Sequence, residues 1–305
     1  MTADEPGARG GRLFVVATPI GNLGDVTLRA IEVLRAVPLV AAEDTRLTRR
    51  LFARHEIATR LISYHARSGP ERERELVEHL RRGDDLAVVT DAGTPVVSDP
   101  GEGLIAAWAG ESGLVVPIPG ASAVLAAVAA SGVAGPRWAF EGFLPRSGRE
   151  RRERLARIAA DERGSVIFEA PGRVGATLRD LAAACGEGRR GAVCRELTKL
   201  HETITRGSLG ELAAAVADGA IPERGEFVLV VGFAGTDGEG ASGAADAAAN
   251  EARVEDARRQ VEELVRDGVA RGDAARRVSA ATGIPRRQLY GSMRDADAGH
   301  RGSAR

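Results

Sequence analysis

The chain has 305 residues, of which 44% are hydrophobic and 28% charged, and its formal net charge is −1. This length fits about two ordinary domains, and this composition is typical of a globular protein with a substantial core. No apolar run reaches the ~18 residues of a membrane-spanning helix, and residues 1–12 lack the apolar segment of a secretory signal. We therefore expect a cytoplasmic protein with no membrane partner.

Cysteine, histidine and basic residues limit the chemistry further. Cys185 and Cys194 are too few for a disulfide framework, and neither they nor the five histidines show a metal-ligand spacing, so we expect no metal. Lys199 is the single lysine among 42 basic residues. A net charge near zero predicts no polyanionic partner by itself, although residues 276–305 hold seven arginines against two aspartates.

The first part of the chain alternates short, continuous apolar runs with helical patterns. Such runs, separated by helices, favour a mostly parallel sheet that is covered on both faces. We expect an α/β domain over 13–135, after a disordered segment 1–12. Its strands are predicted at 13–17, 39–43, 61–64, 86–90 and 114–118, and its helices at 27–37, 45–54, 71–82, 103–112 and 121–131.

A second set of elements begins near residue 138. The strand-like runs between 191 and 207 follow each other without a helix, which indicates antiparallel pairing. We therefore predict a second α/β domain of different topology over 136–233. Its strands are expected at 138–143, 165–170, 191–196, 202–207 and 226–232, and its helices at 148–161, 174–185 and 208–217.

The rest of the chain is expected to be a linker and a small helical segment. Residues 234–252 are rich in Gly, Ala, Ser and Asp, which is typical of a flexible linker. Residues 253–293 read as short helices with the rhythm of a helix-turn-helix, with Gly283 at the turn and Pro285 just inside the next helix. A disordered tail, 294–305, is expected after them.

Polar loops follow four of the strands predicted for the first domain. Ligands bind outside the carboxyl ends of strands in such sheets, and these loops are TPIGN (18–22), EDTR (43–46), TDAGTP (90–95) and PIPGAS (117–122). The chain has no GxxxxGK[ST] loop. Its two GxGxxG/A matches, at 101–106 and 238–243, lack the strand-to-helix context of a dinucleotide site.

The loop TDAGTPVVSDPG (90–101) is the most specific of these. Asp91 stands at the strand end, Gly93 allows close backbone approach, and two prolines stiffen the loop. Asp99 is expected to cap the helix that starts near 101. No basic residue is present to neutralise phosphate, so the loop suits an adenosine and amino-acid ligand held by backbone groups better than a triphosphate.

Two groups of charged residues have open interpretations. Glu43 and Asp44 end a strand, where they can cap a helix, orient ribose hydroxyls or act as a base. A second group surrounds Lys199 on the strand ends of the second domain, where charges are either solvated or functional. It consists of Glu169, Arg173, Arg195, Glu196, Lys199 and Glu202.

The order of the motifs over 13–232 carries a family resemblance. TPIGNLGDVTLRA, AAEDTR, TDAGTPVVSDPG, PIPGAS, FEGFLP, FEAPGR, RELTKLHET and RGEFVLVV follow one another. The chain resembles the tetrapyrrole-methylase superfamily, and within it the group that methylates a cytidine 2′-hydroxyl of 16S rRNA. FEAPGR departs from that group, because Gly172 stands where histidine is usual.

The resemblance implies S-adenosylmethionine (SAM) as methyl donor, bound in the cleft between the two α/β domains. It also implies a homodimer that acts on 16S rRNA of the small ribosomal subunit and not on DNA. The donor residues carried over are Thr18, Pro19, Ile20, Gly21, Asn22, Asp91, Ala92, Gly93, Thr94, Pro95, Pro119, Gly120, Ala121, Ser122, Phe168, Glu169, Gly225 and Glu226. The residues expected to contact RNA are Arg46, Arg173, Arg195, Glu202, Arg286 and Arg287.

Methyl transfer to a ribose 2′-hydroxyl requires that the hydroxyl lose its proton. We hypothesise that Glu43 or Asp44 accepts or orients that proton. Lys199 stabilises the negative charge on the oxygen, or serves as base if burial lowers its pKa.

Two other functions are compatible with these motifs. The first is a methylase of a tetrapyrrole or another small molecule. The basic C-terminal segment disfavours this function, because a small substrate does not need such a segment. The second is a non-catalytic ribosome-assembly binder that keeps the cleft for structure alone, which titration with SAM would test.

Overall fold

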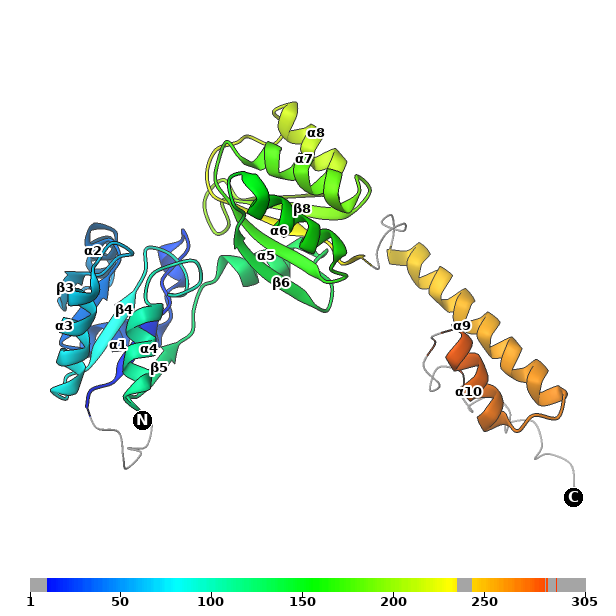
Figure 1. The fold of residues 1–305 in the computed structure, drawn as a ribbon, viewed down its shortest axis with the longest axis horizontal. Helices are drawn as coiled ribbons and strands as arrows, with labels where there is room; N and C mark the ends of the chain where they lie inside the picture. Colours follow the sequence, from blue (N-terminus) through cyan, green and yellow to red (C-terminus); the bar gives the residue numbers. More distant parts are fainter. Residues whose placement is uncertain (1–9, 235–242, 283, 285–288, 290–305) are drawn as a thin grey trace, which may run out of the picture. The chain divides into compact units, whose positions relative to one another are not determined.

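The computed structural model describes residues 10–234, 243–282, 284 and 289 (Figure 1). By their internal contacts the residues form two compact units, Met1–Asp237 and Gly238–Arg305. The first unit holds two five-stranded sheets, one on each side of the predicted boundary at 135/136. Because both sheets belong to one unit, a division into two domains at that boundary stays a prediction.

The first sheet has the strand order β3-β2-β4-β1-β5 and is parallel throughout. Its strands are β1 (Leu13–Val16), β2 (Leu39–Ala42), β3 (Arg60–Ser63), β4 (Leu86–Val89) and β5 (Val115–Ile118). The helices between them are α1 (Leu28–Ala36), α2 (Thr45–Arg54), α3 (Pro70–Arg81) and α4 (Glu102–Gly110), with a 3-10 turn η1 at Leu23–Asp25.

Continuous apolar strands explain why this sheet is covered on both faces. Neighbouring residues of a strand point to opposite faces: Phe14 packs in the cluster that includes Leu34 of α1 and Phe52 of α2. Leu13 packs on the other face in the cluster that includes Leu80 of α3 and Trp108 of α4. The predicted parallel, doubly covered sheet is confirmed.

Helix starts follow the capping chemistry of the sequence, with one correction. The Thr27 side chain accepts a hydrogen bond from Ala30 N at 3.1 Å, and Ser122 accepts one from Leu125 N at 3.4 Å. Asp99, predicted to cap the helix near 101, does not, because α4 begins after Gly101 with no side-chain cap. The Asp99 carboxylate is therefore available for another role.

The second sheet has the order β6-β7-β10-β8-β9, with only β6 and β7 parallel. The antiparallel pairing of β8 with β9 confirms the prediction for 191–207. Its strands are β6 (Trp138–Phe143), β7 (Gly164–Glu169), β8 (Arg190–Arg195), β9 (Thr203–Ser208) and β10 (Phe227–Val231).

Helices also cover both faces of the second sheet. One face packs against α6 (Gly148–Ala160), α7 (Val174–Cys185) and α8 (Leu209–Ala217), through a cluster that includes Ile167 and Leu229. The other face packs against α5 (Ala123–Ser131), where Val124 and Ala127 contact a cluster that includes Val228. Because α5 directly follows β5 of the first sheet and packs on the second sheet, it connects the two sheets.

The second unit contains α9 (Gly243–Arg266) and α10 (Arg271–Thr282), which pack through residues such as Val261 and Val278. The helix α9 begins at Gly243, so residues 243–252 of the predicted linker 234–252 are helical. Alanine is a strong helix former, so an alanine-rich composition is compatible with a helix as well as with a linker. Gly283, Pro285 and the segments 1–9 and 290–305 lie outside the described residues. No helix in the described part of the chain is long and apolar enough to cross a membrane.

Candidate functional site

Two of the predicted ligand loops are joined at the carboxyl edge of the first sheet. Thr18, after β1, and Gly93, after β4, form a bridge in which each backbone N–H donates to the other carbonyl, at 2.8 and 3.0 Å. The buried Thr18 hydroxyl donates to Thr90 O at 3.1 Å. These bonds fix the two loops relative to each other before any ligand binds.

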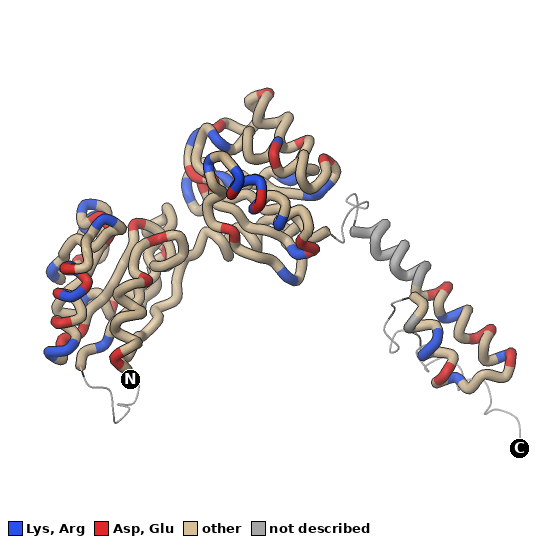
Figure 2. The backbone as a smooth tube through the Cα atoms, viewed as in Figure 1, with Lys and Arg blue, Asp and Glu red and all other residues tan. Residues whose placement is uncertain are grey.

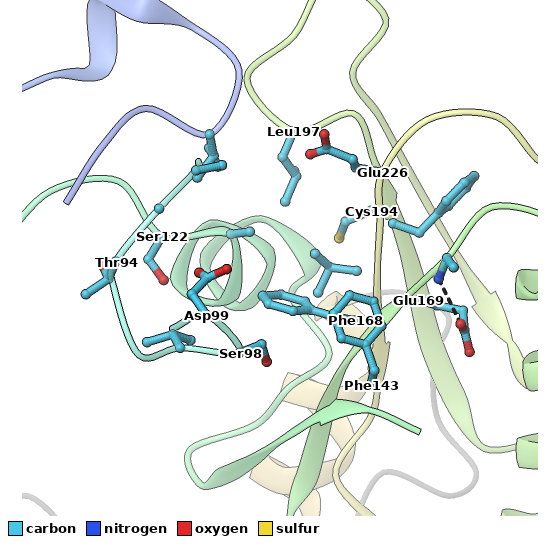
Figure 3. A pocket seen from close by; sticks show the side chains of 18 of the residues that line it. Thr94, Ser98, Asp99, Ser122, Phe143, Phe168, Glu169, Cys194, Leu197 and Glu226 are labelled. Carbon is cyan, nitrogen blue, oxygen red and sulfur yellow. Dashed lines mark hydrogen bonds between the residues drawn. The ribbon is translucent and has the colours of Figure 1, made fainter. Parts of the chain in front are cut away.

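A cavity of about 360 Å³ lies beside this bridge, within the size range of small-molecule sites (Figure 3). Loops that follow strands of the first sheet and strand residues of the second sheet line it. Among them are eight of the predicted donor residues: Ile20, Ala92, Gly93, Thr94, Ser122, Phe168, Glu169 and Glu226.

The other predicted donor residues do not line this cavity: Thr18, Pro19, Gly21, Asn22, Asp91, Pro95, Pro119, Gly120, Ala121 and Gly225. Several of them hold backbone in place instead. The Asn22 side chain accepts from Gly24 N at 3.0 Å, and Gly225 has φ +97° beside Glu196, where a β-carbon would come within 2.5 Å of Oε1.

Aromatic side chains form one wall of the cavity. The rings of Phe143 and Phe168 meet edge to face with centroids 5.6 Å apart, and Phe140 meets Phe168 at 4.9 Å. Phe143 is 54% exposed although it is large and apolar. This wall suits a flat, partly apolar ligand group such as a purine.

No lysine or arginine is among the residues that line the cavity, and its charged members are acidic. Glu169 is 2% exposed and its carboxylate is occupied: it accepts hydrogen bonds from Ala170 N at 2.8 Å and the Thr177 hydroxyl at 2.6 Å, and it pairs with Arg173. Glu226 pairs with Lys199. The lining therefore disfavours a phosphate and tolerates a cation.

Asp99 is the unoccupied carboxylate of this lining, and among the described residues it has no hydrogen bond or ion pair. Burial, together with the negative charges of Glu43 and Asp91, raises the pKa of Asp99 to about 7. The turn that carries it is strained, because Val96 and Ser98 have φ of +76° and +68°. Such backbone strain is often found at functional sites.

Sequence reasoning missed Asp99 as a cavity residue because Asp-Pro-Gly before a helix also fits a cap. It also missed most of the cavity wall that the second sheet and its loops form. The lining residues that the sequence did not single out are Val97, Ser98, Asp99, Ala123, Phe143, Ala170, Pro171, Cys194, Leu197, Phe227 and Val228.

Glu43, Asp44 and Asp91 brace one another beside the cavity. Asp44 N donates to Asp91 Oδ1 at 2.9 Å, and Asp91 N donates to Glu43 Oε2 at 3.3 Å. Asp91 therefore fixes the loop and does not line the cavity. Burial raises the pKa of Glu43, whereas hydrogen bonds from Arg46 lower the pKa of Asp44 to about 2. Asp44 also caps α2, because its side chain accepts a hydrogen bond from Arg46 N. Helix capping is one of the roles that the sequence leaves open for Asp44.

Lys199 lies in a strained loop of its own. Its Nζ is 3.0 Å from Glu196 Oε1 and 2.8 Å from Glu226 Oε1, and Glu196 has φ +52°. Burial alone would lower the pKa of Lys199, but hydrogen bonds to Glu226 and Glu196 outweigh it, so the pKa is raised. Lys199 is an ammonium ion at neutral pH. A β-carbon at Gly21 would overlap its side chain, so the loop after β1 packs against it.

Most of the predicted RNA contacts within the described residues are already engaged. Arg173 donates to Leu144 O at 2.9 Å, Arg195 donates to Arg224 O at 2.6 Å, and Glu202 accepts from Thr198 N at 2.6 Å. Arg46 pairs with Asp44 but is 85% exposed. Arg286 and Arg287 lie outside the described residues.

The family model described as Tetrapyrrole (Corrin/Porphyrin) Methylases matches residues 12–213, so the chain belongs to this family. Solved structures agree in fold. Diphthine synthase has a TM-score of 0.57 at 15% identity, over 73% of this chain and 90% of that one. Uroporphyrin-III C-methyl transferase from Thermus thermophilus, complexed with S-adenyl homocysteine, has a TM-score of 0.53 at 19% identity, over 73% and 98%.

Within the family the chain belongs to the ribosomal RNA small subunit methyltransferase I group, as the motif order implied. The proteins of that name from Synechocystis and Micromonospora olivasterospora are both 44% identical to it, over 92% and 96% of this chain and 96% and 88% of theirs. The Bacillus subtilis protein of that name is 37% identical, over 92% of this chain and 93% of its own.

Proposed function

We propose that the chain transfers a methyl group from SAM to a cytidine 2′-hydroxyl of 16S rRNA in the small ribosomal subunit. The observation that carries this proposal is the cavity itself, which has an aromatic wall, no cationic side chain and an unpaired carboxylate. It occurs in a chain of the ribosomal RNA small subunit methyltransferase I group.

The residues of the cavity fit SAM, which combines an adenosine with a positively charged sulfonium and an amino acid. Phe143 and Phe168 offer faces and edges to the adenine, and the backbone at Gly93, with φ +81°, allows close approach. Asp99 supplies a negative charge for the cationic part of the donor. A triphosphate nucleotide would meet carboxylates with no compensating cation.

When bound, SAM would supply a methyl group from its sulfonium sulfur, and the acceptor oxygen would attack the methyl carbon in line and displace the sulfur. The C–O bond forms as the C–S bond breaks, the sulfur keeps the electron pair, and the hydroxyl proton must leave. The protein must therefore hold the hydroxyl in line and accept that proton.

Glu43 is the better of the two proposed bases. Its raised pKa favours accepting a proton. Within the cluster of Glu43, Asp44 and Asp91, its carboxylate accepts one hydrogen bond, from Asp91 N at 3.3 Å. Asp44 is committed to Arg46 and to the cap of α2, and its pKa of about 2 makes it a weak base. Lys199, as an ammonium ion, stabilises the negative charge that develops on the oxygen.

The test is methyl transfer from labelled SAM to small ribosomal subunits taken from a strain without the enzyme, followed by mass spectrometry of the 16S rRNA. We expect one new 2′-O-methylcytidine. Donor binding without transfer to any RNA would point to a tetrapyrrole or small-molecule acceptor, and absence of donor binding would point to an assembly binder. We also propose a cytoplasmic homodimer, which sedimentation of the purified chain would test.

A further inference from the structure

Helix α2 has an unusual charge pattern. Its sequence, TRLTRRLFAR, holds four arginines and no acidic residue. Thr48, Leu51 and Phe52 are buried, while the four arginines are exposed. Figure 2 marks basic residues in blue and acidic residues in red along the backbone. Phe52 packs the helix into a core cluster of the first sheet, and the arginines take no part in that cluster. The arginines are Arg46, Arg49, Arg50 and Arg54.

Three of these arginines have no partner in the part of the chain that the structure describes. Arg46 pairs with Asp44, but the side chains of Arg49, Arg50 and Arg54 form no hydrogen bond or ion pair with any described residue. Other arginine-rich helices carry more compensation, although Arg152 and Arg157 of α6 also have no partner among the described residues. On α3, two arginines pair with glutamates of the same helix, and on α6 three arginines pair with nearby carboxylates.

The spacing on α2 brings like charges together. Arg46, Arg50 and Arg54 stand four residues apart, which places them along one side of the helix, and like charges at that spacing destabilise a helix. Arg46 also lies in the first turn, where the helix dipole disfavours a cation. The dipole favours Arg54 in the last turn, but the repulsion along the stripe and the cation in the first turn act against the helix, so a role outside the fold explains them better.

The stripe is about 12 Å long at 1.5 Å per residue. Each strand of a DNA duplex carries one phosphate for each roughly 3.4 Å of helix axis, and on that scale the stripe is long enough to contact several consecutive phosphates. A hollow of about 400 Å³ adjoins it, lined by Arg49, Phe52 and Leu61 among others, with no carboxylate in its lining. The surface around α2 is therefore both basic and indented.

The position of α2 relates this surface to the site. The helix begins at Thr45, directly after Glu43 and Asp44, which brace the loop that carries Asp91. The Arg46 charge acts on Asp91 and lowers its pKa, against the larger effect of burial. A strand held along α2 would thus start at the edge where the acceptor must be presented.

We propose that the exposed arginines of α2 bind the phosphates of the RNA substrate and set the register of the strand at the site. This inference rests on the proposed function. The partner is an RNA strand because the proposed substrate is 16S rRNA, whose phosphates an arginine stripe contacts without reading bases.

The experiment compares two pairs of substitutions in the full chain. Arg50→Gln with Arg54→Gln removes two charges from α2, and the control, Arg152→Gln with Arg157→Gln, removes two exposed arginines from α6. For each protein, binding of unmodified small ribosomal subunits is measured over a range of salt, together with SAM affinity and thermal unfolding.

We expect the α2 variant to bind subunits on the order of tenfold more weakly at low salt. The slope of log K against log[salt] should become shallower by about 1.4, at roughly 0.7 for each lost phosphate contact. SAM affinity should stay unchanged, and the melting temperature should stay or rise because repulsion is relieved.

Binding and slope equal to wild type, or an equal loss in the α6 control, would overturn the inference. If the wild-type chain methylates subunits while the α2 variant is unaffected, only the inference fails. If the wild-type chain transfers no methyl group to RNA, the proposed function is refuted, and the inference is refuted too because it rests on that function.

Discussion

Replacing Asp99 by asparagine should separate stability from donor binding. The pKa of this carboxyl is raised from 3.8 to about 7, first by burial and then by Glu43 and Asp91. As the pH rises from about 4 to 7, the unfolded chain loses its Asp99 proton while the folded chain keeps it. The carboxyl therefore destabilises the fold increasingly over this window, and the full cost remains above pH 7.

The magnitude follows from the difference between 3.8 and about 7. At 1.36 kcal/mol per pH unit the upper limit is about 4 kcal/mol. Solvent screening of a half-buried group reduces it to about 1–2 kcal/mol. Asp99→Asn should thus be more stable than wild type by about 1–2 kcal/mol at pH 8 and equal to it near pH 4.

Donor binding should respond in the opposite sense. Loss of a partly screened charge pair corresponds to roughly tenfold weaker SAM binding at pH 8. Wild-type affinity should itself fall below pH 7, as Asp99 takes up its proton. S-adenosylhomocysteine, which lacks the sulfonium charge, should lose less affinity than SAM if the carboxylate faces the sulfur.

The assays are urea unfolding at pH 4 and pH 8 and calorimetric titration with both ligands. Asp218→Asn, at the exposed end of α8, provides a control of the same chemistry outside the cavity. The reasoning is refuted if Asp99→Asn shows no stability difference that grows with pH, or if it binds SAM as wild type does.

Three further predictions concern the rest of the site and the second unit. Lys199→Met should keep SAM affinity within about twofold and lower single-turnover methyl transfer about 100-fold; unchanged transfer would remove Lys199 from the mechanism. Gly21→Ala should destabilise the chain by about 1–3 kcal/mol in urea unfolding, because its β-carbon overlaps the Lys199 side chain; wild-type stability would contradict that packing. Ending the chain at Asp237 removes the second compact unit. It should keep SAM binding but weaken binding to small ribosomal subunits, and wild-type methylation by the shortened chain would exclude the C-terminal helices from RNA docking.

The secondary structure of both sheets could be predicted from the sequence to within a residue or two at each end. The predicted strand 138–143 is β6 (Trp138–Phe143), and the predicted helix 174–185 is α7 (Val174–Cys185). Short apolar runs and helical spacing are local signals, and burial on both faces of a parallel sheet makes the runs continuous. The start of α9 at Gly243 does not follow from the sequence, because an alanine-rich composition fits both a linker and a helix.

The cavity was less predictable because its walls come from distant parts of the chain. Cys194 and Phe227 line it from β8 and β10, where they read as ordinary core residues. The face of the second sheet that packs on α5 is also the face that reaches the cavity, as Val228 shows by belonging to both. Hydrophobic alternation distinguishes the two faces of a strand but cannot tell packed core from a ligand wall.

A methyltransferase of this kind must hold a cationic donor beside a polyanionic substrate. One uniform charge could not serve both, since a basic cavity would repel the sulfonium and an acidic surface would repel RNA. In this chain the cavity lining contains acidic residues and no lysine or arginine, while the arginines of α2 that lack a partner among the described residues lie outside that lining. The net charge of −1 conceals this separation. Higher salt should therefore weaken RNA binding more steeply than SAM binding, because phosphate contacts release many counterions and a single donor cation does not.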